Sequence, residues 1–449
     1  MFKKFTSGCV SIVQKYLPDP FIFAVILTFF VLILGMVLTG QGPLAMTIHW
    51  SKGLWTLLAF SMQMALVLVT GHALANAPSF KKALKILAKI PKSPSQAIIL
   101  VTVISTIACW INWGFGLVIG AIFAKELAKE VKGVDYRLLI ASAYSGFLVW
   151  HAGLSGSIPL VVATGGPEVV KATAGVVTSP IPTSATLFSS YNLIILAILL
   201  VTLPLINKAM HPDTDHTVTI DPKLLVEEPA IIIAKENMTP ADKLENSSII
   251  SILLVIMGFS YIIYYFVKGG SLDLNIVNAI FLFLGIALHG TPIRFVNAIT
   301  NAAKGTAGII LQFPFYAGIM GMMVGTSASG ISLAGVMSTS FVSISNQHTF
   351  PLFTFLSAGL VNFFVPSGGG QWAVQAPIMM PAGAALGVPA AKTAMAISWG
   401  DAWTNMIQPF WALPALGIAG LGAKDVMGFC IIDLLYSGVI IGLGLMFIS

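Results

Sequence analysis

Apolar residues form long runs along most of this chain, and polar residues gather in the short segments between them. A helix needs about 20 mostly apolar residues to cross the hydrocarbon core of a bilayer. Nine runs reach or approach that length, so the pattern predicts an all-α polytopic membrane protein. The predicted spans are residues 20–38, 54–75, 138–163, 185–206, 247–267, 272–289, 306–326, 391–418 and 427–447.

Two further apolar runs, 96–124 and 350–386, are broken near their middle by glycine clusters. Each half then has about 12–16 residues, which is short of the length needed to cross. Non-helical backbone at membrane depth is tolerated where protein buries it or where it lines a watery cavity. These runs therefore predict two re-entrant hairpins, each returning to the side from which it entered.

The composition agrees with a lipid-solvated protein and excludes several classes. Hydrophobic residues make up 57% of the 449 residues and charged residues only 9%, against about 25% charged in soluble domains. A soluble enzyme, a disordered chain and a nucleic-acid-binding protein are thereby excluded. The three cysteines, Cys9, Cys109 and Cys430, are far apart, so we expect free thiols and no metal site.

Positive charges fix the predicted orientation. With the N-terminus in the cytoplasm and nine spans plus two hairpins, 19 of the 23 Lys and Arg residues fall on the inner side. Residues 207–246 hold 8 of the 17 acidic residues and are predicted to form a solvated cytoplasmic linker. This linker divides the chain into a first membrane repeat, 1–206, and a second part, 247–449, with one extra helix.

The two parts resemble each other at their glycines. A shift of 254 residues aligns six glycines of the first half with glycines of the second, among them Gly114 with Gly368 and Gly146 with Gly400. The helices after Asp19 and Asp273, which also align, run in opposite directions across the membrane in the predicted topology. The sequence therefore predicts two inverted repeats, as in many secondary transporters.

Four polar segments interrupt the apolar stretches, two in each half: 112–116, 151–157, 366–371 and 403–409. Each combines Gly or Pro, which disfavour a continuous helix, with Ser, Thr, Asn or Gln. Helix ends at such breaks expose unpaired N–H groups, which attract anions, and C=O groups, which attract cations. Secondary transporters bind substrate and coupling ion at breaks of this kind.

These breaks supply the predicted site. Hydroxyl, amide and glycine positions at three of them are predicted to bind substrate: Ser155, Ser157, Ser367, Gly368, Gly369, Gln371, Asn405 and Gln408. A second set is predicted to couple transport to a cation: Asn112, Gly114, Asp401 and Thr404. A carboxylate in a partly dry site needs a cation or a proton, so Asp401 is predicted to be a sodium ligand or a proton carrier. No cofactor beyond Na⁺ or H⁺ is expected.

Simpler interpretations exist for the same residues. The glycines can serve close helix packing. Asp401 can be an acid at a water-exposed helix end, and we expect Asp433 to lie at the membrane interface. His151 can donate to a carboxylate or carry a proton, and it can equally be a buried histidine with its hydrogen bonds satisfied.

The sequence holds no HExxH, GxSxG or phosphate-loop motif. A carrier, an anion channel and a membrane-embedded enzyme remain as classes, and paired broken helices favour the carrier. A dicarboxylate would need a further cationic partner for its second carboxylate, and the breaks contain no Lys or Arg. A small monocarboxylate is therefore the predicted substrate, with a dicarboxylate or another organic anion as the alternative.

At these motifs the chain resembles the short-chain fatty acid transporter family of the AtoE type. The resemblance rests on segments 16–20 (YLPDP), 112–116 (NWGFG), 365–370 (VPSGGG) and 408–414 (QPFWALP), and on 58–75 and 220–225. It implies a bacterial inner-membrane carrier of short carboxylates such as butyrate or acetoacetate. The plan is similar to that of the ion transporter superfamily, which implies a homodimer with a moving transport domain.

The chain departs from the family pattern at three positions. Histidine is expected where Gln371 stands, glutamate is usual where Asp401 stands, and relatives are glycine-rich around His151.

Overall fold

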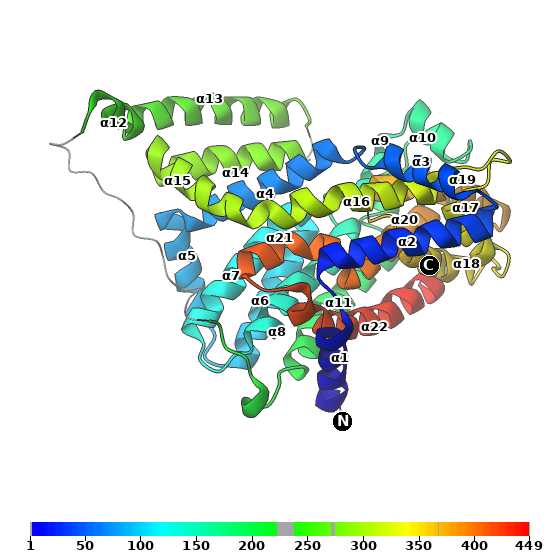
Figure 1. Ribbon diagram of the computed structural model, residues 1–449, viewed down its shortest axis with the longest axis horizontal. Helices are drawn as coiled ribbons and strands as arrows, with labels where there is room; N and C mark the ends of the chain where they lie inside the picture. The colour runs from blue at the N-terminus through cyan, green and yellow to red at the C-terminus, as the bar shows by residue number, and fades with distance from the viewer. Residues whose placement is uncertain (1, 222–237, 271–273, 367, 449) are drawn as a thin grey trace.

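The computed structural model describes residues 2–221, 238–270, 274–366 and 368–448 (Figure 1). Within these ranges the regular structure is entirely helical. The α-helices are α1 (Phe2–Tyr16), α2 (Pro20–Thr39), α3 (Pro43–Gly53), α4 (Leu58–Asn76), α5 (Pro78–Ala88), α6 (Pro94–Ile111), α7 (Trp113–Glu130), α8 (Tyr136–Ser145), α9 (Ser157–Thr164), α10 (Pro167–Ala172), α11 (Ser190–Ala209), α12 (Pro240–Glu245), α13 (Ser248–Val267), α14 (Leu274–His289), α15 (Pro292–Ala303), α16 (Ala307–Val324), α17 (Leu333–Val342), α18 (Phe350–Asn362), α19 (Gly368–Ala385), α20 (Ala390–Thr404), α21 (Pro409–Ala419) and α22 (Ala423–Phe447). Short 3₁₀ segments join some of them: η1 (Gly146–Ala152), η2 (Thr183–Ala185), η3 (Thr214–His216), η6 (Lys304–Thr306) and η7 (Asn405–Ile407).

Each of the nine predicted spans corresponds to a helix or to a helix broken by a 3₁₀ segment. In the described part of the chain, six helical stretches are long and apolar enough to cross a membrane, and several shorter apolar helices accompany them. The prediction of an all-α polytopic membrane protein is therefore confirmed. The agreement has a simple cause, because apolar length alone specifies a spanning helix.

The two runs predicted to be hairpins each form a pair of packed helices, α6 with α7 and α18 with α19. The arms α6 and α7 have 18 residues each, more than the 12–16 that the sequence suggested. The length argument for the first hairpin was therefore wrong, since α6 alone is long enough to cross. Whether either pair is re-entrant stays a prediction.

The order of elements is the same in the two halves. In the first, the pair α6–α7 precedes a helix, a 3₁₀ segment and a second helix, namely α8, η1 and α9. In the second, the pair α18–α19 precedes α20, η7 and α21. This order agrees with the predicted repeat, while the inverted relation between the halves stays a prediction.

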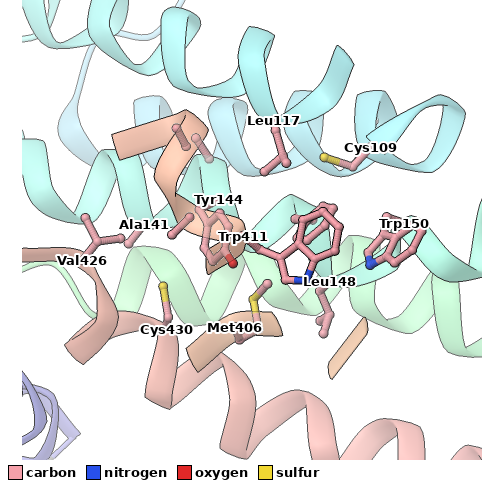
Figure 2. Packing of buried hydrophobic residues seen from close by; sticks show 14 of the residues in the cluster. Cys109, Leu117, Ala141, Tyr144, Leu148, Trp150, Met406, Trp411, Val426 and Cys430 are labelled. Carbon is pink, nitrogen blue, oxygen red and sulfur yellow. The ribbon is translucent and has the colours of Figure 1, made fainter. Parts of the chain in front are cut away.

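The buried centre of the protein is the broken stretch α8–η1–α9, of which 72% of the most apolar window is buried, against 17% for α13 at the periphery. Figure 2 shows Tyr144 and Trp150 from this stretch between Cys109 and Leu117 on one side and Met406 on the other. At the start of η1, a Cβ on Gly146 would lie 2.5 Å from the carbonyl carbon of Ser105 in α6. Only glycine permits this close approach, which is why the break can sit directly against a neighbouring helix.

The beginning of the predicted linker packs against the membrane part. Asp135 is fully buried and caps α8 by accepting a hydrogen bond from Leu138 N (3.0 Å). The same carboxylate accepts from Val218 N (2.9 Å) and pairs with Arg137 (2.9 Å). The segment near Val218 is therefore docked, whereas the sequence predicted a solvated connection. Residues 222–237 of the linker lie outside the described residues.

Candidate functional site

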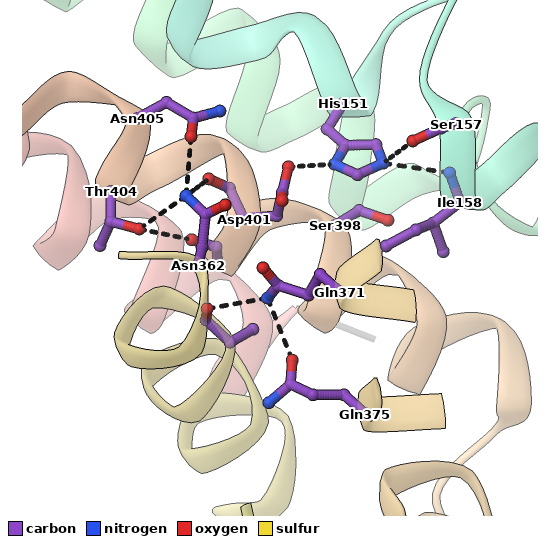
Figure 3. A network of polar contacts seen from close by, with 12 residues as sticks. His151, Ser157, Ile158, Asn362, Gln371, Gln375, Ser398, Asp401, Thr404 and Asn405 are labelled. Carbon is purple, nitrogen blue, oxygen red and sulfur yellow. Dashed lines mark hydrogen bonds and ion pairs between the residues drawn. The ribbon is translucent and has the colours of Figure 1, made fainter. Parts of the chain in front are cut away.

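The centre of the candidate site is a buried pair between the two halves. His151 lies in η1 and Asp401 in α20, and His151 Nδ1 is 2.8 Å from Asp401 Oδ2 (Figure 3). The side chains are 0% and 1% exposed. Both residues lie near a helix break. The 3₁₀ segment η1 carries His151 with its ring pointing inward, and α20 ends three residues after Asp401. Asp401 is thus an interior residue, and the interpretation as a water-exposed helix end is excluded.

One backbone contact fixes the hydrogen positions of the pair. Ile158 N lies 3.0 Å from His151 Nε2, and a backbone N–H can only donate. Nε2 is therefore the unprotonated nitrogen, and the neutral ring carries its proton on Nδ1. Nδ1–H donates to Oδ2 of Asp401, and the pair carries a net charge of −1 when that carboxylate is ionised. The second carboxylate oxygen, Oδ1, has no hydrogen-bond partner among the described residues.

The first turn of α19 abuts this pair. A Cβ on Gly368 would overlap Oγ of Ser157 and lie 2.9 Å from Cε1 of His151. At Gly369 a Cβ would meet open space. Gly368 therefore lies at the close contact between α19 and the His151 ring, whereas Gly369 does not. Ser367, also predicted to bind substrate, lies outside the described residues.

A single amide joins the end of α20 to α18. Asn362 Nδ2 donates to the backbone oxygen of Asp401 (2.8 Å), to Thr404 Oγ1 (3.0 Å) and to Asn405 Oδ1 (2.7 Å). Thr404 Oγ1 in turn donates to the backbone oxygen of Gly359 (2.8 Å). Two predicted residues, Thr404 and Asn405, thus lie beside Asp401. Sequence reasoning missed Asn362, although an amide inside the apolar stretch that precedes the 366–371 break is a signal that could have found it.

Two predicted glutamines also lie in the interior. Gln371 Nε2 donates to Ala358 O (2.8 Å) and to Gln375 Oε1 (3.0 Å). Gln408 Nε2 donates to Phe363 O (2.7 Å). Gln371 therefore connects the break at 366–371 to α18, and Gln408 connects the break at 403–409 to the end of α18. The Oε1 atoms of both side chains have no hydrogen-bond partner among the described residues.

The predicted residues of the first half lie at the α6–α7 junction. Asn112 Oδ1 caps α7 by accepting from Phe115 N (3.0 Å), and Ser155 Oγ accepts from Trp113 N (3.1 Å). Gly114, also in the first turn of α7, is buried. Trp113 at this junction packs against Trp150 and Trp411, and Trp150 stacks on the His151 ring at 4.1 Å between centroids. The structure therefore brings Ser157, Gly368 and Asp401 against His151 and joins Thr404 and Asn405 to Asp401 through Asn362. It places Asn112, Gly114 and Ser155 at the α6–α7 junction.

Comparison with known proteins identifies the chain. The family described as "Short chain fatty acid transporter" matches residues 1–448. This chain belongs to that family. A relative from Haemophilus influenzae named "Putative short-chain fatty acid transporter" is 47% identical over the full length of both chains. A relative of the same name from Escherichia coli K12 is 48% identical over 96% of this chain and 97% of its own.

Among solved structures, the crystal structure of the Alcanivorax borkumensis YdaH transporter covers 95% of this chain and 98% of its own. The TM-score is 0.43 and the sequence identity 15%. That likeness is too low to carry an argument about this chain.

As a member of the short-chain fatty acid transporter family, the protein is a transporter and not an enzyme. Ser157, His151 and Asp401 are connected in the order of a hydrolase triad, with Ser157 Oγ 3.0 Å from His151 Nε2. A general base, however, must offer its lone pair to the nucleophile. The lone pair of Nε2 already faces Ile158 N–H, so this geometry holds a helix end instead of activating a serine.

A further buried carboxylate lies in the last helix. Asp433 in α22 is 0% exposed, and neither of its oxygens has a hydrogen-bond partner among the described residues. Asp433 is thus covered by the protein, and its position relative to the membrane interface stays a prediction.

Proposed function

We propose that this protein is a secondary carrier that takes up short-chain monocarboxylates, such as butyrate or acetoacetate, together with a cation. The single observation that carries the proposal is the buried His151–Asp401 pair, which lies where the breaks of both halves meet. Full-length similarity to proteins named as short-chain fatty acid transporters supports the substrate class.

Backbone groups are the proposed partners of the substrate carboxylate. The N-termini of α9 and α19 meet at Ser157 and Gly368, and the first N–H groups of a helix have no partner within that helix. Their partial positive charge favours an anion. The side-chain amide nitrogen of Asn405 is buried and has no partner among the described residues, so it can donate as well.

This arrangement favours one carboxylate over two. None of the four breaks contains Lys or Arg, so a second carboxylate would be buried without a cationic partner. Each hydrogen bond to a charged group contributes roughly 1.5–3 kcal/mol, so two or three of them offset much of the desolvation of a single carboxylate.

The cation is proposed to act at Asp401. The pair carries a net charge of −1 in a dry place, and a bound cation or proton would neutralise it. Of the four residues predicted for coupling, Thr404 lies within one turn of Asp401, while Asn112 and Gly114 lie at the α6–α7 junction. We propose that Asn112 and Gly114 stabilise the α6–α7 junction.

The location in the cell and the assembly are also part of the proposal. The distribution of Lys and Arg supports a bacterial inner membrane and a cytoplasmic N-terminus. A homodimer with a moving transport domain is proposed from the resemblance to the ion transporter superfamily alone.

Uptake into proteoliposomes tests the function. Labelled butyrate should accumulate when an inward proton or sodium gradient is imposed, and unlabelled acetoacetate should compete while succinate should not. Empty liposomes are the control for passive entry of the acid. Competition by succinate as strong as by acetoacetate would favour the dicarboxylate alternative, and single-channel currents would favour a channel.

A further inference from the structure

We propose that the proton which drives transport binds to Nε2 of His151, and that its binding releases the N-terminus of α9. This inference rests on the proposed function and names its coupling ion. It assigns the proton to His151, for which the sequence left open both a proton-carrying role and a purely structural role.

The first step concerns the single lone pair of Nε2. It accepts the hydrogen bond of Ile158 N–H at 3.0 Å. A proton added to Nε2 would place two N–H donors face to face at that distance. The hydrogen bond is then lost and replaced by a repulsion, so the protonated ring and the present position of Ile158 exclude each other.

The second step concerns where the protonated ring finds its partners. Ser157 Oγ, 3.0 Å from Nε2, can accept the new N–H once the backbone has moved. Nδ1–H keeps its contact with Asp401, whose negative charge balances the imidazolium. Proton uptake therefore changes the pair from a net charge of −1 to zero, which favours uptake in a dry interior. The two groups share the proton as a unit.

The third step connects the proton to the substrate. The helix α9 packs on both α19 and α20. Gly368, at the start of α19, touches both Ser157 and the His151 ring closely enough to exclude a Cβ. A shift of Ser157 and Ile158 must therefore displace the first turn of α19, where the substrate carboxylate is proposed to bind.

The other titratable groups on the elements packed against η1 do not change the assignment of the proton to the His151–Asp401 pair. Asp401 is the acid that contacts His151. On α6, α8 and α11 the nearest such groups are neutral: the Cys109 thiol and the Tyr144 and Tyr191 hydroxyls. Tyr144 donates to the backbone oxygen of Asn405 at 2.5 Å.

The charged residues of these elements lie toward the ends away from η1. They are Lys125, Glu126, Lys129 and Glu130 in the last two turns of α7, Arg137 in the first turn of α8, Lys208 in the last turn of α11 and Lys392 in the first turn of α20. The segments α9 and η7 contain no titratable side chain.

Tryptophan fluorescence tests the inference without transport. The His151 ring stacks on Trp150 with 13° between the ring planes, so an imidazolium should quench that indole. Purified protein in detergent is titrated between pH 4 and 9. We expect a reversible loss of emission on acidification in the wild type that is absent in His151→Gln. The matched control is His49→Gln, because His49 Nε2 in α3 lies 2.8 Å from Oε1 of Gln41, in the turn between α2 and α3, and its loss should leave the titration unchanged.

A second variant should shift the titration in the opposite direction. Ile158→Pro removes the N–H that faces Nε2, and proline is tolerated in the first turn of a helix. Proton binding should become about tenfold tighter, the equivalent of one hydrogen bond. A purely structural role of His151 predicts no such shift. This variant also keeps the test decisive if His151→Gln fails to fold.

Uptake measurements separate this inference from the proposed function. In proteoliposomes, His151→Gln should lose the acceleration of butyrate uptake by an inward proton gradient. Equal titration in wild type and His151→Gln, no shift in Ile158→Pro, or uptake driven by sodium alone would overturn the inference while butyrate transport stands. A His151-dependent titration in a protein that does not move butyrate would leave the proton site standing and refute the proposed substrate.

Discussion

His151 and Asp401 are 250 residues apart in the chain, yet Nδ1 of one lies 2.8 Å from Oδ2 of the other in the protein interior. Each residue lies at a break in its own half. One contact therefore makes the polar interior of the two halves a single site, and a change to either residue is expected to act on both halves.

Asp401→Asn should separate exchange from accumulation. The amide oxygen can still accept from Nδ1–H, so the shape of the site is kept while its negative charge is lost. We expect butyrate exchange to persist and uphill accumulation to disappear in proteoliposomes. Asp215→Asn, at an exposed position, is the control. If Asp401→Asn concentrates butyrate as well as wild type, the coupling site lies elsewhere.

Gly368→Ala should abolish transport, whereas Gly369→Ala should not. The first adds a Cβ that overlaps Ser157 Oγ, and the second adds one into open space. Gly368→Leu should be inactive for the same reason. Uptake is measured at matched levels of membrane-inserted protein. Normal transport by Gly368→Ala would remove this turn of α19 from the site.

Affinity should be modest and should rise slowly with the length of the acid. Each buried CH₂ adds ~0.8 kcal/mol, which is about a fourfold gain per methylene. Competition by acetate, propionate and butyrate against labelled butyrate measures the series. Nanomolar binding of acetate would contradict an anion site built from backbone N–H groups without a basic side chain.

The linker should tolerate shortening within residues 222–237 and should not tolerate changes at Asp135, against which its beginning packs. Deletions within residues 222–237 should leave butyrate affinity nearly unchanged, because this acidic segment is distant in the chain from every break. Asp135→Ala should destabilise the protein by about 2–5 kcal/mol, because it removes a helix cap and leaves Arg137 without its partner. Competition against labelled butyrate measures the affinity of the deletion variants, and thermal unfolding in detergent measures the stability of Asp135→Ala. A large loss of affinity in a folded deletion variant would show that the linker takes part in recognition.

Asp433→Asn should stabilise the protein at neutral pH. A buried carboxylate without a partner costs more than the amide of the same shape, so a gain on the order of 1 kcal/mol or more is expected. Asp425→Asn is unsuitable as a control because Asp425 Oδ2 accepts from Gly422 N, so Asp215→Asn serves here too. Destabilisation by Asp433→Asn would indicate that the carboxylate binds a cation in the wild type.

Hydropathy was enough to place the nine predicted spans, because a long apolar run in lipid has few alternatives to a helix. Spacing also identified the breaks, since glycine, proline and amides mark them locally. The partners across the site could not be predicted in the same way. Nothing in the local sequence of His151 specifies Asp401, and nothing in the local sequence of Asn362 specifies its partners Asp401 and Thr404. Such contacts depend on how separate helices pack, and the local pattern does not encode that packing.

The separation of the two partners also has a consequence for how the protein is made. A ribosome adds about 5–20 residues each second, so the 250 residues between His151 and Asp401 take roughly 12–50 s to synthesise. During that interval the first half enters the bilayer with a polar break that has no carboxylate to receive its imidazole proton. An insertion machinery that shelters this segment until α20 arrives would prevent the early half from misfolding in lipid. Biogenesis, and not only transport, is therefore expected to be sensitive to changes at the break around His151.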